Sequence, residues 1–418
     1  MGKIFLTVQI CKAHQPSSHS RTSSLPIKKY SSSGPVKSYA SRSDRQKLSK
    51  QPGVPAGRLS RRTLRNAIMA PTYTSVVLAK RPKDDIVAGE TFKVVSDNPA
   101  PSADSLKDGQ VLFETNYLSI DPAMRGWLND TRSYIPPVRI GEVMRGYAVG
   151  TVKESKNPSF PVGSYAAGSV GWTELKVCEA KELQKAALPR GAHLTDTLSV
   201  LGLTGLTAYF GILDVGKVKA GDFVVVSGAA GATGSVVGQI AKLKGATVLG
   251  IAGSEDKCRW LVEELGFDGA LNYKDKEFFK KFRNATKNLI DVYFDNVGGE
   301  VLDMALGRAK PHARFVMCGG ISQYNTSNPQ GPKNYLMIIT MRIRMEGFIV
   351  FDYEKEYPRA LQDLSQWLSE GKIKRKETVV KGGLVKAEEA LRDLYNGINT
   401  GKLMVEVKPV TTKARASL

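Results

Sequence analysis

The sequence places a turn of small residues between an apolar segment and a segment with the composition of a helix. Residues 223–227 are apolar up to a final serine, Gly228, Gly231 and Gly234 follow, and residues 235–243 favour a helix. Glycines in such a turn let backbone N–H groups approach a pyrophosphate, and the helix N-terminus adds unsatisfied donors and a positive dipole end. The spacing Gly-x-x-Gly-x-x-Gly departs from the usual Gly-x-Gly-x-x-Gly, so the prediction of a dinucleotide site depends on its strand-turn-helix context.

The chain has two parts with different sequence patterns, and the glycine turn lies in the second of them. From residue 73 to about 180, short β-type runs such as residues 75–79 and 111–120 alternate with glycine and proline turns, which indicates a compact β-rich domain. After residue 198, strands alternate with helices, which is typical of a doubly wound parallel sheet. The predicted strands are residues 223–227, 247–252, 289–294 and 314–318, the predicted helices are residues 235–243 and 257–265, and a helix at 360–368 and a strand at 403–407 follow.

Residues after the second predicted strand indicate which dinucleotide is bound. A carboxylate at the end of that strand, which closes at Ala252, would favour a cofactor without a ribose phosphate. The chain instead continues with Gly253 and Ser254, and it offers the cations Lys257 and Arg259. Cationic and hydroxyl groups suit a 2′-phosphate, so the sequence predicts NADP(H) rather than NAD(H).

The charge of the chain is concentrated at one end. The formal net charge is +20 over 418 residues, and residues 1–69 hold 14 Lys and Arg against one acidic residue, Asp44. This Ser- and Pro-rich leader has no sustained apolar period and is predicted to be disordered. Its composition fits an organelle transit peptide, an extension ahead of an internal start at Met69, or a nucleic-acid-binding arm. The rest of the chain is near neutral, so we do not expect a nucleic acid as its partner.

Several kinds of chemistry lack sequence support. Cys11, Cys178, Cys258 and Cys318 are scattered without a Cys-x-x-Cys pair, and the histidines show no metal-ligand spacing, so reduced thiols and no metal site are expected. No Gly-x-Ser-x-Gly elbow suggests covalent catalysis. No apolar segment approaches the roughly 18 residues of a membrane span, so no membrane partner is expected.

Several motifs between residues 73 and 410 together resemble the zinc-independent medium-chain dehydrogenase/reductase family, and in particular its prostaglandin reductase and alkenal double-bond reductase members. Relatives with zinc carry Cys and Gly-His-Glu ligands that this sequence lacks. The segments that carry the resemblance are residues 121–126, 144–150, 202–209, 228–234, 294–299, 318–325 and 344–348.

The resemblance implies an α/β fold in which a Rossmann doubly wound parallel sheet is inserted in a β-rich GroES-like catalytic domain. The domains would be a leader (1–69), the first part of the catalytic domain (70–197), the Rossmann NADP-binding domain (198–352), the return to the catalytic domain (353–410) and a tail (411–418). The implied cofactor-binding residues are Gly231, Ala232, Thr233, Gly234, Gly253, Ser254, Lys257, Tyr273, Asn296, Cys318, Gly319, Gly320, Ile321, Ser322, Gln323, Tyr324, Phe348, Ile349, Val350 and Asn399.

The resemblance also implies an activity. Hydride would pass from NADPH to the β-carbon of an α,β-unsaturated ketone or aldehyde, with Tyr147 and Tyr324 as the catalytic tyrosines beside the substrate. A third family tyrosine is replaced by Ala123, which enlarges the pocket and removes a hydroxyl. Arg125 is expected to form an interdomain ion pair. Quinone reduction or alcohol–carbonyl interconversion on the same scaffold, and a remote nucleotide-sensing RNA-binding role, are the alternatives.

The family further implies a homodimer. A cytoplasmic location is expected, or a mitochondrial one if the leader is a transit peptide.

Overall fold

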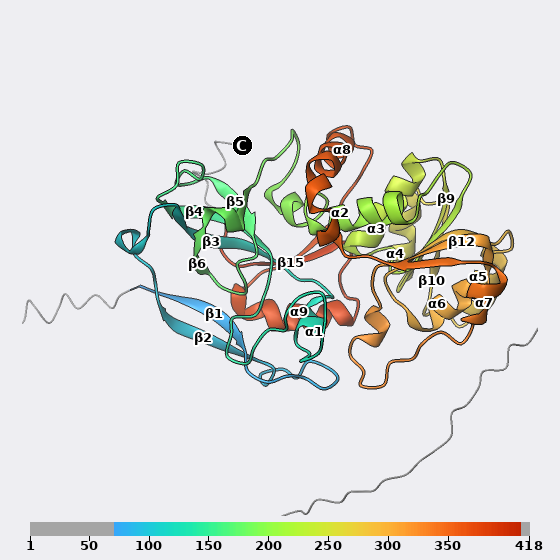
Figure 1. The fold of residues 1–418 in the computed structure, drawn as a ribbon, viewed down its shortest axis with the longest axis horizontal. Coiled ribbons are helices and arrows are strands. Elements are labelled where there is room, and N and C mark those ends of the chain that lie inside the picture. The colour runs from blue at the N-terminus through green and yellow to red at the C-terminus, as the bar shows by residue number, and fades with distance from the viewer. Residues whose placement is uncertain (1–70, 411–418) are drawn as a thin grey trace, which may run out of the picture. The chain divides into compact units, whose positions relative to one another are not determined.

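The computed structural model describes residues 71–410. The predicted leader, residues 1–69, and the tail, residues 411–418, lie outside the described residues. Figure 1 shows two sheet-based halves, with the last strand of the described chain running beside an early one.

One half is built on a six-stranded sheet. Its strands are β8 (Phe223–Val226), β9 (Thr247–Ala252), β10 (Gly269–Asn272), β11 (Ile290–Asp295), β12 (Ala309–Met317) and β13 (Arg344–Gly347). Their order is β10-β9-β8-β11-β12-β13, and each neighbouring pair is parallel. The strand order reverses between β8 and β11, as in doubly wound dinucleotide folds. This confirms the predicted Rossmann sheet.

Helices cover both faces of this sheet, which explains why β8 is apolar at each position. The helices of this half are α2 (Leu203–Phe210), α3 (Ala232–Leu243), α4 (Glu255–Arg259), α5 (Phe278–Ala285), α6 (Gly299–Leu306), α7 (Leu336–Thr340) and α8 (Tyr357–Ser369). Val224 and Val226 pack into one apolar cluster with α2, α3 and α8, whereas Val225 packs into another with α5 and α6. A strand buried on both faces has no polar side to present to water.

The other half is built on a seven-stranded sheet and a two-stranded one. The elements are β1 (Thr72–Leu78), β2 (Phe92–Pro99), β3 (Gln110–Ser119), α1 (Met124–Trp127), β4 (Ala148–Ser155), β5 (Tyr165–Gly168), β6 (Leu175–Glu179), β7 (Leu183–Lys185), β14 (Glu377–Val380), α9 (Ala387–Tyr395) and β15 (Lys402–Glu406). The larger sheet has the order β14-β15-β3-β4-β5-β7, in which β6 also pairs with β3, and β1 pairs with β2. Since β15 pairs antiparallel with β3, the C-terminal strands return to the sheet begun by the N-terminal ones.

Helix α8 shows where the packing changes between the halves. Tyr357, Ala360 and Leu364 belong to the apolar cluster of the six-stranded sheet, and Figure 1 shows α8 beside α2. The return to the seven-stranded sheet is made by β14 and β15. The domain boundary at residues 352 and 353 stays a prediction. Helix α8 packs with the half that is built on the six-stranded sheet.

Two predicted helices differ from the observed ones at their ends. Helix α3 begins at Ala232 rather than at residue 235. Its N-cap is Gly231, which has an extended backbone and whose carbonyl accepts the first helical hydrogen bond, from Ser235 N at 3.1 Å. The helix predicted at 257–265 is α4 followed by a π-turn, Trp260–Glu264. Within residues 71–410, no helix has the length and apolarity needed to cross a bilayer.

Candidate active site

A cleft lies at the carboxyl ends of β8 and β11, where the order of the six-stranded sheet reverses. Gly228 and Asn296 line it from these strand ends. Asp121, Tyr147 and Lys402 line it from the half built on the seven-stranded sheet. Ligands of doubly wound folds bind at this switch point, so the cleft is the candidate active site.

The glycine turn fits a pyrophosphate by its shape. Gly228 has φ +58°, a conformation that favours glycine, and Gly231 N donates to Gly228 O at 3.0 Å. A Cβ added at Gly234 would lie 2.5 Å from Gly228 O, so the turn folds this closely only with glycine there. The resulting hollow lies at the N-terminus of α3, where backbone N–H groups and the helix dipole favour an anion.

The end of β9 forms the part of the cleft assigned to the adenosine. The Tyr273 ring lies over Gly253, where an added Cβ would be 3.0 Å from Cε1 of the ring. Ser254 Oγ accepts from Lys257 N at 3.3 Å and so caps α4. Arg259 is ion-paired with Asp256 on the exposed side of α4. Of the two cations that the sequence offered, Lys257 is the one that lines the cleft.

Lys257 is half-buried and holds a backbone carbonyl in this structure. Its Nζ donates to Gly397 O at 2.6 Å. Burial lowers the pKa of Lys257, and the positive charge of Lys274, which also lines the cleft, lowers it further. An anion bound between these two ammonium groups would relieve both effects, as a ribose phosphate would.

A buried carboxylate fixes the strand ends on which the cleft is built. Asp295 Oδ1 accepts hydrogen bonds from Ser227 Oγ at 2.8 Å, Val297 N at 3.0 Å and Gly298 N at 3.0 Å. Burial raises the pKa of Asp295, and the two backbone donors oppose this rise. Asn296 Nδ2 donates to Ser227 O at 2.7 Å, so its side chain is held by β8. Asp295 lies in residues 294–299, one of the segments that carry the family resemblance, but no role was predicted for it.

Tyr324 and Tyr147, the two predicted catalytic tyrosines, both line the cleft. Tyr324 Oη accepts from Gly320 N at 3.0 Å, which leaves its own proton available to a ligand oxygen. Tyr147 Oη donates to Gln184 Oε1 over a longer 3.4 Å. Burial raises the pKa of Tyr147 to about 12 and also raises that of Tyr324, so both are neutral phenols at physiological pH.

Three aromatic side chains line the cleft together with Ala123. Trp127 Nε1 donates to Tyr134 Oη at 2.9 Å, and the rings of Tyr134 and Phe351 are 6.4 Å apart between centroids. All four residues line the cleft. These three aromatic residues were not predicted from the sequence, because they lie in a loop and in short helices where periodicity carries no signal.

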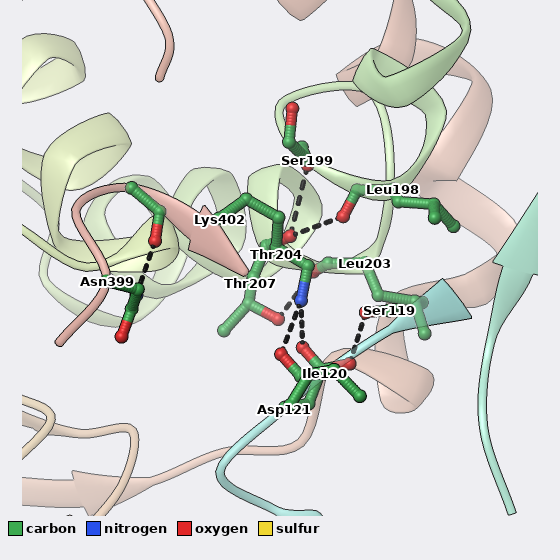
Figure 2. Close-up of polar contacts among 11 residues, drawn as sticks. Ser119, Ile120, Asp121, Leu198, Ser199, Leu203, Thr204, Thr207, Asn399 and Lys402 are labelled. Atoms are coloured by element: carbon green, nitrogen blue, oxygen red, sulfur yellow. Dashed lines mark hydrogen bonds and ion pairs between the residues drawn. The ribbon is translucent and has the colours of Figure 1, made fainter. Parts of the chain in front are cut away.

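A buried ion pair forms the cleft floor (Figure 2). Lys402 is 2% exposed, and its Nζ donates to Ile120 O at 2.9 Å and to Asp121 Oδ1 at 2.6 Å. The hydroxyl of Ser119 donates to the other Asp121 oxygen. A buried ammonium is tolerated only when its donors are satisfied, so this contact fixes the start of the turn that carries Ala123.

Segment 399–402 reaches both parts of the cleft. Gly401 N donates to Ala230 O at 2.8 Å in the glycine turn, one residue before Lys402 reaches Asp121. Asn399 Nδ2 donates to Gly401 O at 2.8 Å. The hydroxyls of Thr204 and Thr207, also drawn in Figure 2, bond to backbone carbonyls of their own segment.

Most of the predicted site residues come together in this one cleft. The predicted residues that do not line it are Ser254, Gly320 and Gln323. Ser254 caps α4, and Gly320 acts through its N–H to Tyr324. Gln323 bonds through Nε2 to Ser322 Oγ at 3.0 Å. The roles assigned to the individual residues remain predictions.

Arg125 does not form the predicted interdomain ion pair. It is 2% exposed, and its guanidinium donates to the backbone carbonyls of Pro82, Lys83 and Asp84 at 2.8–3.3 Å. Its Nη1 donates to Asn129 Oδ1 at 2.5 Å. The prediction was wrong because a buried guanidinium can satisfy its fixed fork of donors with carbonyl groups as well as with carboxylates.

Among residues 71–410, no cluster of three or more His, Cys, Asp or Glu side chains could hold a metal ion. The free thiols of Cys178 and Cys258 are buried, and burial raises the pKa of each to about 11. In the described part of the chain these cysteines therefore have the character of protonated core residues.

A doubly wound sheet with a glycine turn at its switch point, facing a cleft shared with a β-rich half, defines the class of dinucleotide-dependent oxidoreductases. Two family models agree with this. An N-terminal domain of oxidoreductase matches residues 74–186, and a zinc-binding dehydrogenase model matches residues 232–366.

Similar proteins show which family within this class the chain belongs to. The NADPH-dependent curcumin reductase of Escherichia coli is 39% identical over 79% of this chain and 96% of that protein. Prostaglandin reductase 1 of Bos taurus is 42% identical over 72% of this chain and 90% of that protein. The crystal structure of CurA from Vibrio vulnificus in complex with NADPH has a TM-score of 0.75 and 40% identity, covering 80% and 99% of the two chains. The chain belongs to the zinc-independent medium-chain dehydrogenase/reductase family and is an oxidoreductase.

Proposed function

We propose that this protein catalyses the NADPH-dependent reduction of the carbon–carbon double bond in α,β-unsaturated ketones and aldehydes. NADP(H) is its cofactor. The observation that carries the proposal is the hydrogen bond from Gly320 N to Tyr324 Oη, which leaves the tyrosine proton free for a ligand in the cleft. We call the part of the cleft lined by Trp127, Tyr134 and Phe351 its substrate end. A neutral donor beside an apolar pocket suits a carbonyl oxygen that gains charge during reduction.

The residues of the chain divide the work between holding the cofactor and polarising the substrate. When bound, the cofactor supplies the hydride that is added to the β-carbon. The N–H groups of Gly231–Gly234 would hold its pyrophosphate and Lys257 its 2′-phosphate. Tyr324 would donate to the carbonyl oxygen and stabilise the enolate charge. Tyr147 would flank the substrate, and its single proton would have to leave Gln184 Oε1, 3.4 Å away, before it could serve as a second donor.

The remaining predicted residues would bind the cofactor along the cleft. Gly253 and Tyr273 would contact the adenosine, and Asn296 the ribose. The nicotinamide half would lie against residues 318–323, residues 348–350 and Asn399, which are the positions expected from the family resemblance.

A substrate panel tests the proposal. Enones, alkenals, quinones and simple alcohols should be compared at fixed NADPH, with products identified by mass spectrometry. We expect stoichiometric NADPH oxidation that yields saturated ketones and aldehydes, unchanged by a chelator. Quinol formation or alcohol oxidation in place of these products would favour the alternative oxidoreductase activities. Absence of turnover on each enone and alkenal would refute the proposal.

The predicted leader has its own test. Removal of residues 1–68 should leave reductase activity unchanged, whereas an RNA-binding role would be lost with them in a salt-dependent manner. A fusion of residues 1–69 to a fluorescent protein would report the location, mitochondrial for a transit peptide and cytoplasmic otherwise.

A homodimer is also proposed. Strand β13 lies at the edge of the six-stranded sheet, and Tyr335, Leu336 and Ile339 of the adjacent α7 region are 56–70% exposed. An open strand edge beside apolar side chains is suited to pairing with a second copy. Sedimentation velocity should give twice the mass of the monomer. The variant Ile339→Glu should sediment with the mass of a single monomer.

A further inference from the structure

Two loops from opposite halves of the molecule contact each other beside Tyr324. Asn325 Nδ2 donates to Asp85 Oδ1 at 2.9 Å, and Ser327 N donates to Asp84 Oδ1 at 2.6 Å. Asp84 and Asp85 lie between β1 and β2, whereas Asn325 and Ser327 follow β12 of the six-stranded sheet. Two hydrogen bonds therefore join the halves one and three residues after the predicted catalytic tyrosine.

Arg125 holds the loop that carries the two carboxylates. This buried guanidinium donates to three successive carbonyls of the loop, Pro82 O, Lys83 O and Asp84 O. A buried side chain that directs several hydrogen bonds to one surface loop holds that loop in a defined position. Arg125 belongs to α1, two residues after Ala123, so the same helix connects the carboxylates to the wall of the substrate end.

A second contact between the halves lies at the same end of the cleft. The ring of Tyr134, from the loop after α1, packs near that of Phe351, from the segment after β13. Both side chains line the cleft. The carboxylate contacts and this ring pair are therefore two separate contacts that join the halves beside the cleft.

We propose that Asp84 and Asp85 are positioning residues of the reductase. They hold the segment from Tyr324 to Ser327 so that the tyrosine hydroxyl faces the substrate during hydride transfer, and they release it when cofactor and product leave. The proposal rests on the proposed function in that it takes Tyr324 to act on the substrate. The exposed position of both carboxylates suits this role, because such hydrogen bonds are weak enough to break in each cycle.

Substitution tests the positioning role. Asp84→Ala/Asp85→Ala removes both acceptors, and Asp84→Asn/Asp85→Asn keeps an Oδ1 acceptor at each position. We expect the alanine pair to lower kcat about fivefold to twentyfold while the Kd for NADPH changes less than twofold, since the glycine turn and Lys257 are untouched. The asparagine pair should stay within twofold of the parent. Unchanged kcat in the folded alanine pair, or equal losses in both pairs, would overturn the proposal.

A reversible cross-link tests release without depending on the enone substrate. Asp85→Cys/Asn325→Cys should form a disulfide on mild oxidation, with Asp85→Cys alone as the control. We expect the oxidised pair to release NADPH at least tenfold more slowly in a stopped-flow displacement assay, and a reductant to restore the parent rate. Fast release from a chain shown by mass spectrometry to be cross-linked would refute the proposal. A parent that binds NADPH yet reduces no enone would instead count against the proposed function.

Discussion

Lys257→Ala should separate the two nicotinamide cofactors by affinity. Lys257 Nζ lies at the adenosine end of the cleft, half-buried and 2.6 Å from Gly397 O. A hydrogen bond between an ammonium and a phosphate contributes about 1.5–3 kcal/mol. We take this bond to replace the one to Gly397 O, whose loss costs about 0.5–1.5 kcal/mol.

The midpoints of these two ranges differ by about 1.3 kcal/mol, so Lys257→Ala should raise the Kd for NADPH roughly tenfold. Part of the attraction should persist through Lys274, whose charge also faces this end of the cleft. The Kd for NADH should change less than twofold, because NADH lacks the phosphate.

Fluorescence of the bound reduced nicotinamide gives both dissociation constants directly. Lys276→Ala is the matched control, since Lys276 is an exposed neighbour that does not line the cleft. The affinity of the parent for NADPH should also fall with added salt more steeply than in the variant. An equal loss for NADPH and NADH would refute the assignment of Lys257 to the 2′-phosphate.

Four further predictions test other parts of the protein. Tyr324→Phe should lower kcat/KM for an enone about tenfold to a hundredfold, with NADPH affinity retained, and a retained rate would remove the tyrosine from the mechanism. Because burial raises the pKa of Tyr324 above its ordinary value and takes that of Tyr147 to about 12, the pH profile of kcat/KM should show no break from a tyrosine between pH 6 and 9. Ala123→Tyr should raise KM for enones with bulky substituents more than for short alkenals, measured as a ratio of the two KM values. Gly401→Ala should destabilise the fold by about 3 kcal/mol or more in denaturant unfolding, because its Cβ would lie 1.9 Å from Lys376 O at φ +67°.

The half built on the six-stranded sheet was predictable because its sequence signals are local. The apolar strand, the glycine turn and the helix after it lie within about twenty residues, and the structure confirms the predicted sheet around β8 and β9. Strand β12 begins at Ala309, earlier than predicted. Its first part contains Lys310, Pro311 and His312, and a proline between two polar residues hides the strand pattern.

The contacts that shape the cleft were less accessible to sequence reasoning. Lys402 and Asp121 are far apart in the chain, and a single lysine at the start of an apolar strand gives no sign of its partner. Arg125 was assigned a carboxylate partner, whereas the structure gives it backbone carbonyls, which have no sequence signature. The resemblance named the tyrosines, but the aromatic contact of Tyr134 with Phe351 depends on how the halves meet.

The bond from Gly401 N to Ala230 O has a consequence for how the protein is made. Strand β15, which begins at the next residue, is the last strand of the described chain, and it pairs with β3 near the beginning. During synthesis the glycine turn emerges long before the segment that braces it. Residues 399–406 must therefore leave the ribosome before the cleft is complete, and a chain stalled earlier would lack Asn399 and the contact of Lys402 with Asp121.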